Sequence, residues 1–202
     1  MATPLDLTDM FGECWCVTLT RQPPVKALQH MGVDTPTRRP HGLDQASRRL
    51  TATPERVPPG GTVMLLAHQA GPGWTLIMEL DGLTGWVGMR EDVLSALSAD
   101  GTGACSAMRD PNRFQILYAE AGRVLAGLDP TTGRRWGTPD DRLAHALTAA
   151  GFAADDTGEM TDELARWNSS QRTVAALHAA TGVHLAAETF RDPWLGGLTT
   201  DV

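Results

Sequence analysis

The stretch from Gly71 to Leu97, GPGWTLIMELDGLTGWVGMREDVLSAL, constrains the fold more than any other part of the chain. In its first half, apolar side chains fall on every second residue and predict a strand with one apolar face, made of Trp74, Leu76, Met78 and Leu80. Asp81-Gly82 ends the strand. After Gly85-Trp86 the spacing changes to four, at Met89, Val93 and Leu97, which predicts a helix. We therefore expect a β-turn-α unit at the centre of the fold.

Further strands are predicted on both sides of this unit. The apolar run 62–68 should pair with Trp74–Leu80 as an antiparallel hairpin, and 113–120 should form a second hairpin with 123–129. CWCVTL at 14–19 is rich in β-forming residues, with Cys14, Cys16 and Thr18 on one face. Residues 103–109 give a weaker strand signal.

Helices are predicted where apolar residues recur every three or four positions. One runs from Pro24 to Gly32, and another begins at Thr138 as its N-cap, with Pro139 in the first turn and Gly151 at its end. The tail predicts one helix after Thr161 and a second after residues 168–170, whereas 191–202 has little periodicity and is expected to fray.

Together these elements predict an α+β fold. A mostly antiparallel sheet of five to six strands would be covered on one face by helices. Residues 1–154 would form this domain, and residues 155–202 a helical C-terminal appendage packed on it. Residues 33–61 form a long basic, proline-rich loop, which we interpret either as a solvated excursion or as a lid or docking arm for an acidic partner.

Composition narrows the function classes. The chain has 202 residues and a net charge of −7, which argues against general nucleic-acid binding on electrostatic grounds. No apolar run is long enough to span a membrane, and the first residues do not resemble a secretion signal, so we expect a cytoplasmic protein. Three dispersed cysteines argue against a disulfide framework.

The candidate site residues are aromatic and charged side chains near predicted loops. Trp74 and Trp86 flank the central strand, and Glu79 lies on it and needs a partner such as Arg90 or Arg113 if it is buried. The loop containing Arg134, Arg135 and Trp136 combines the residue types that dominate protein interfaces, and it could grip an anion or an acidic surface.

No pattern in the sequence indicates a cofactor or a metal. Cys14 and Cys16 could share a metal with His30 or Cys105, but structural zinc sites use a second cysteine pair that is missing here. The six histidines fit no ligand spacing, and phosphate-loop, dinucleotide-binding, nucleophile-elbow and kinase motifs are all absent. This favours binding over catalysis and leaves catalysis undecided.

Short motifs spread along most of the chain carry a family resemblance. They are Cys16-Val17-Thr18, Pro24–Gly32, Gly73-Trp74-Thr75, Gly85-Trp86, Val93-Leu94, Leu97-Ser98, Tyr118-Ala119-Glu120, Gly122-Arg123-Val124-Leu125, Arg135-Trp136-Gly137 and Thr181-Gly182-Val183. In this order they resemble an actinobacterial, streptomycete-type domain family of unknown function. The resemblance implies no activity for any residue, and by analogy it suggests an immunity or antitoxin-like binding module.

Two functional hypotheses follow. The first is a cytoplasmic module that binds another protein through exposed tryptophan and arginine loops. The second is a small-molecule-binding protein or enzyme, for example from a biosynthetic cluster, with a pocket between sheet and helices that holds Glu79, His68 or Cys16. The loop 33–61 would gate such a pocket.

Overall fold

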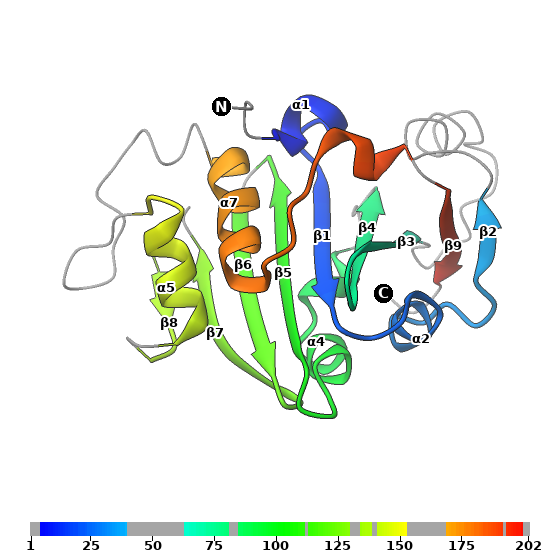
Figure 1. Cartoon of the computed structure of the whole chain (residues 1–202), viewed down its shortest axis with the longest axis horizontal. Helices are drawn as coiled ribbons and strands as arrows, with labels where there is room; N and C mark the ends of the chain where they lie inside the picture. The colour runs from blue at the N-terminus through cyan, green and yellow to red at the C-terminus, as the bar shows by residue number, and fades with distance from the viewer. Residues whose placement is uncertain are drawn as a thin grey trace.

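A computed structural model of the chain describes residues 5–39, 63–80, 85–111, 113–129, 134–138, 141–152, 169–191 and 193–199 (Figure 1). Its strands are β1 (Trp15–Thr20), β2 (Thr37–Arg39), β3 (Val63–Gly71), β4 (Trp74–Leu80), β5 (Gly103–Asp110), β6 (Arg113–Glu120), β7 (Arg123–Asp129), β8 (Arg134–Trp136) and β9 (Trp194–Thr199). Its helices are α1 (Leu7–Phe11), α2 (Pro24–His30), α4 (Glu91–Leu97), α5 (Arg142–Ala149) and α7 (Ser169–Thr181), with short 3-10 turns η2 (Val87–Met89) and η3 (Ala187–Phe190).

All nine strands in these ranges join one antiparallel sheet, in the order β2-β9-β3-β4-β1-β5-β6-β7-β8. The prediction of a mostly antiparallel sheet is confirmed, but the prediction of five to six strands is wrong. The additional strands are β2, β8 and β9. The first two have three residues each and the third contains adjacent glycines, so none has the apolar alternation by which strands are recognised.

The central unit forms as predicted. Trp74, Leu76 and Met78 on β4 point into one apolar cluster, while Ile77 between them points into another. Val93 and Leu97 of α4 are buried, although Met89 belongs to η2 and not to the helix. Both predicted hairpins, β3–β4 and β6–β7, are present. The break at Asp81-Gly82 lies outside the described residues.

Helices pack on both faces of the sheet, which corrects the expectation that they cover one face. Helices α5 and α7 share an apolar cluster with Trp15, Val17 and Leu19 of β1. Helices α2 and α4 share a second cluster with Leu65, Ile77 and Leu117 on the opposite face (Figure 1). Because every residue of β1 is buried, this inner strand needs cover on both sides.

The C-terminal part of the chain contributes a strand as well as a helix. Helix α7 forms as predicted, and Val174 and Leu177 are buried. The expectation that the tail frays beyond residue 191 is wrong for Trp194–Thr199, because β9 lies within the sheet between β2 and β3. Here Gly197 faces Val33, whose side chain occupies the space that a Cβ would need.

Helix α5 forms close to the predicted position but with a different N-cap. Helix α5 begins at Arg142, and its N-cap is Asp141, not Thr138, because the Asp141 carboxylate accepts a hydrogen bond from the N–H of Ala144. The helix predicted after Thr161 and most of the basic loop 33–61 lie outside the described residues, except that Thr37–Arg39 forms β2. The division into domains 1–154 and 155–202 stays a prediction.

Candidate functional site

Trp74 is buried, although the sequence suggested that it contributes to binding. Its side chain is 5 % exposed and lies in the cluster under α5 and α7. The Arg21 guanidinium covers the ring, with its carbon 4.4 Å from the ring centroid. This cation–π contact at the end of the β3–β4 hairpin gives Trp74 a packing role.

Glu79 is fully buried on β4, and backbone amides bind it in place of the arginine expected from the sequence. Oε2 accepts a hydrogen bond of 2.7 Å from the N–H of Val87, and Oε1 accepts one of 2.7 Å from the N–H of Gly88. The two proposed partners form ion pairs elsewhere: Arg90 with Asp92, and Arg113 with Asp110. Burial raises the pKa of Glu79 to about 7, and the two amide hydrogen bonds oppose this shift.

Other polar side chains meet Glu79 on the same face of the sheet. Cys16 is its direct partner on β1, and the thiol contacts the carboxylate. Ser106 Oγ of β5 lies 2.9 Å from Thr18 Oγ1 and 3.6 Å from Cys16 Sγ. We call Cys16, Thr18, Glu79 and Ser106 the central polar cluster. All four are buried.

The turn Trp86–Met89 covers the central polar cluster. Gly88 lies so close that an added Cβ would be 2.8 Å from Glu79 Oε1 and would overlap Thr18 Oγ1. Trp86 is 5 % exposed and packs on Cys16 and Met108. Trp86 therefore closes the cluster instead of offering a free indole to a partner.

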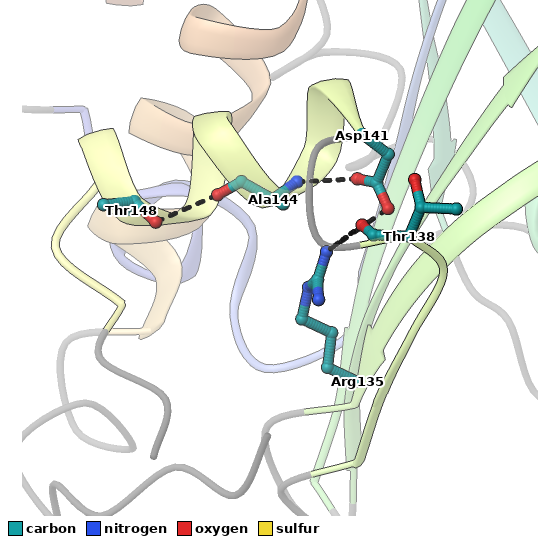
Figure 2. Close-up of polar contacts among 5 residues, drawn as sticks. All are labelled: Arg135, Thr138, Asp141, Ala144 and Thr148. Carbon is teal, nitrogen blue, oxygen red and sulfur yellow. Dashed lines mark hydrogen bonds and ion pairs between the residues drawn. The ribbon is translucent and has the colours of Figure 1, made fainter. Parts of the chain in front are cut away.

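Arg135, by contrast, joins the edge strand β8 to the start of α5 (Figure 2). Its Nη2 donates to the Thr138 carbonyl at 2.8 Å and to Asp141 Oδ2 at 3.2 Å. The other carboxylate oxygen of Asp141 accepts from the N–H of Ala144 and so caps the helix. Arg135 therefore fixes β8 to the start of α5, and anion binding by this loop stays a prediction.

Arg134 and Trp136 occupy the opposite face of β8, because alternate residues of a strand point to opposite sides. Both are exposed, Trp136 to 36 %. The indole lies over Gly127, its partner on β7, where an added Cβ would be 2.6 Å from Trp136 Nε1. Leu125, two residues before Gly127 on the neighbouring strand β7, is 37 % exposed. We call Leu125, Arg134 and Trp136 the β8 surface.

The predicted site residues thus do not converge. Glu79 and Trp86 belong to the central polar cluster and its cover, whereas Arg134, Arg135 and Trp136 belong to the edge strand β8, with β1, β5, β6 and β7 between β4 and β8. Trp74 lies in the cluster under α5 and α7, and Arg90 pairs with Asp92 at the start of α4. The sequence did not single out Ser106, Gly88, Asp141 or Leu125. Only Asp141 carried a recognisable signal, as an acidic residue before the helix.

Cys16, Cys105 and His68 do not share one site. Cys105 belongs to the apolar cluster under α5 and α7, on the other face from Cys16. His68 is paired with Leu76 of that same cluster and packs against Trp194, with ring centroids 5.3 Å apart. Within the described ranges, no three His, Cys, Asp or Glu side chains are grouped to hold a metal ion.

Within the same ranges, no helix combines the length and apolarity that crossing a membrane requires.

Comparison with known proteins gives a family and no activity. Residues 4–194 match DUF6461, described as a family of unknown function. The chain belongs to this family. No curated protein matches the chain, and no solved structure matches it. Membership of a family of unknown function confirms that part of the sequence-based expectation, and the actinobacterial character of the family stays a prediction.

Proposed function

We propose that this DUF6461 protein is a protein-binding module that docks its partner on the β8 surface. The observation that carries this proposal is the indole of Trp136, which is 36 % exposed on the edge strand β8, while Leu125 on the neighbouring strand β7 is also exposed. Tryptophan is among the residue types most enriched in the few side chains that supply most binding energy at interfaces. The Trp136 and Leu125 side chains can contact a partner without rearrangement of the core.

The support beneath this surface favours binding. Arg135 anchors β8 from the opposite face through Thr138 and Asp141, and Trp136 rests on Gly127. A side chain that is fixed before binding loses less conformational entropy when the partner arrives. The brace under β8 therefore increases the affinity that one exposed tryptophan can give.

The chemistry of the surface indicates what the partner presents. Leu125 and Trp136 require an apolar pocket or ridge on the partner. We therefore infer a partner with an apolar contact region.

The test is affinity capture from native lysate of the source organism, followed by mass spectrometry, with wild type, Trp136→Ala and Leu198→Ala. Leu198 is the matched control, because it is 52 % exposed on β9, a strand far from β8 in the sheet order. We expect Trp136→Ala to reduce recovery of a stoichiometric partner at least roughly tenfold, as truncation of a hot-spot residue does. Leu198→Ala should leave recovery unchanged.

If Trp136→Ala recovers as much partner as wild type, the interface does not include β8. Failure to recover a stoichiometric partner under several growth conditions would count against the binding role itself. The melting temperature of each variant separates loss of binding from loss of folding.

A narrower proposal is a cytoplasmic immunity or antitoxin-like role, in which the partner is a toxin that this protein neutralises. It rests on the family resemblance and on the docking surface together. The test is to express the gene adjacent to this protein's gene, the candidate toxin gene, and to compare cell growth with and without this protein. Toxicity that wild type relieves and Trp136→Ala does not would support the proposal. If expression of the adjacent gene is not toxic, the proposal is wrong.

The central polar cluster favours the second candidate, a small-molecule-binding protein or enzyme. A carboxyl, a thiol and two hydroxyl groups converge there. However, burial raises the pKa of the Cys16 thiol well above its usual value, so the nucleophilic thiolate is disfavoured while the turn is closed. Thermal-shift screening of metabolites with wild type and Ser106→Ala would detect a ligand that uses this cluster.

A further inference from the structure

The turn Trp86–Met89 both covers Glu79 and hydrogen-bonds to it. The carboxylate has no exposed surface, and its two oxygens accept from adjacent backbone amides of that turn. If the turn moves away, Glu79 gains water and loses both amide donors at once. The conformation of the turn and the protonation of Glu79 are therefore coupled by geometry.

Within the part of the chain that the structure describes, the groups facing Glu79 supply no fixed countercharge. The carboxylate is opposite Cys16 on β1 and opposite the apolar Leu65 on β3. From β5, Ser106 adds a hydroxyl group, as Thr18 does from β1. The thiol and the amides that contact Glu79 are neutral.

The nearest charges on the turn's own side belong to the start of α4. Arg90 and Asp92 follow the turn directly and pair with each other at 2.7 Å, where both side chains are exposed. Neither charge is among the causes of the raised pKa of Glu79.

Burial without a countercharge favours the neutral carboxylic acid. The two amide bonds favour the ionised form, but desolvation outweighs them, and the pKa of Glu79 is raised to about 7 from 4.5. In an open turn the carboxyl group would be hydrated and would return toward its ordinary pKa. Closing the turn therefore takes up a proton between these two values, and ionisation favours opening.

We propose that the turn Trp86–Met89 is a proton-controlled cover over the central polar cluster. It is closed while Glu79 is protonated and opens more often when Glu79 ionises, which gives solvent access to Cys16. The cover lies apart from the β8 surface, so this proposal holds whether or not that surface binds a partner. It supplies the condition under which the otherwise unreactive thiol becomes accessible.

The experiment measures amide hydrogen exchange at Val87 and Gly88 as protection factors, which removes the intrinsic pH dependence of exchange. For pKa values of about 7 closed and 4.5 open, the closed-to-open ratio should fall about 70-fold between about pH 5 and about pH 8. Glu79→Gln cannot ionise, so its protection factors at these amides should not follow this pH change. The amide of Val17, in the centre of the buried strand β1, reports global unfolding. Protection at Val87 and Gly88 that is lower than at Val17 at each pH therefore assigns the response to opening of the turn.

A second measurement follows the thiol. In a Cys14→Ser background, alkylation of Cys16, located by peptide mapping, is compared at about pH 8 between the chain that keeps Glu79 and the chain that carries Glu79→Gln. Because both are measured at one pH, the pH dependence of the reagent cancels. Glu79→Gln also removes a charge that raises the pKa of Cys16, which by itself would speed labelling of the variant, so faster labelling with Glu79 present reports access to the thiol. We expect faster labelling when Glu79 is present, since only then does an ionised carboxylate favour the open turn.

Two results would overturn the proposal. Constant protection at Val87 and Gly88 in wild type between about pH 5 and about pH 8 would show that the turn does not respond to protons. An equal fall in protection in Glu79→Gln would assign the response to another group.

Discussion

Glu79 and Asp141 use the same hydrogen bond in opposite surroundings. Each carboxylate accepts from a backbone N–H at the start of a helical segment, Glu79 from η2 and Asp141 from α5. Asp141 also pairs with Arg135 at 3.2 Å near the edge of the sheet, whereas Glu79 is fully buried with neutral neighbours. The Arg135 cation gives Asp141 a charged partner on β8, whereas burial among neutral groups raises the pKa of Glu79 and makes it responsive to pH. Two carboxylates that accept from backbone amides in the same way therefore differ because of their surroundings.

The largest expected effect is a loss of global stability as pH rises, caused by Glu79. Its folded pKa of about 7 exceeds its unfolded value of 4.5, so between these values the folded state binds more protons. The stabilisation is fully present below about pH 4.5 and is lost as pH rises through about 7, by roughly 3 kcal/mol. Urea denaturation at intervals across this range measures it. Glu79→Gln should remove this component, and an identical slope in both proteins would contradict the assignment.

Next in size is Gly88→Ala, which should destabilise the protein by about 2 kcal/mol through overpacking. The added methyl group would overlap Thr18 Oγ1 and approach Glu79 Oε1. Thr18→Ala vacates part of this space, so the double variant should be more stable than the sum of the two single changes predicts. Chemical denaturation of all three variants tests this. Strictly additive effects would show that the turn relaxes away from the cluster.

Asp141→Ala should cost about 1 kcal/mol, the usual value of a helix N-cap. The change also removes one of the two acceptors that hold Arg135 at this corner and leaves the Thr138 carbonyl, so β8 should loosen. Asp141→Asn keeps an acceptor for the N–H of Ala144 and should lose less. Denaturation together with amide exchange in β8 measures both effects. Equal losses for Ala and Asn would assign the effect to the ion pair instead of the cap.

The smallest expected effect is that of Arg135→Lys, about 0.5 kcal/mol. Lysine keeps the charge, but it cannot direct the fork of a guanidinium at both Thr138 and Asp141. If the brace orients Trp136 for binding, this variant should weaken capture of the partner more than it lowers the melting temperature. A variant that binds as well as wild type would show that β8 needs no brace.

The sequence predicts those parts of the fold whose pattern is local. Alternation identifies β4, β6 and β7, an apolar run identifies β3, and β-forming residues identify β1. The central β-turn-α unit follows from a change of spacing. The pattern misses β9 because Gly196 and Gly197 carry no apolar signal, although the packing of Val33 requires a glycine at 197. Coverage on both faces follows only once the sheet is assembled, because it depends on which strands become inner ones.

The site is predictable to a smaller extent. Residue type correctly marks Glu79 as a carboxylate that needs a partner if buried, but backbone amides have no sequence signature, so the arginine is the natural and wrong choice. Exposure depends on tertiary packing, which is why Trp74 and Trp86 cannot be distinguished from Trp136 by sequence. The pairing of Arg135 with Asp141 depends on where α5 begins.

The position of β9 bears on how the chain matures in the cell. Synthesis reaches Trp194–Thr199 after every other described element, yet this strand separates β2 from β3. Until it leaves the ribosome, β3 presents an open hydrogen-bonding edge and β2 has no neighbour among the described strands. The nascent protein is therefore vulnerable to aggregation until β9 is available, and this strand closes the gap between β2 and β3.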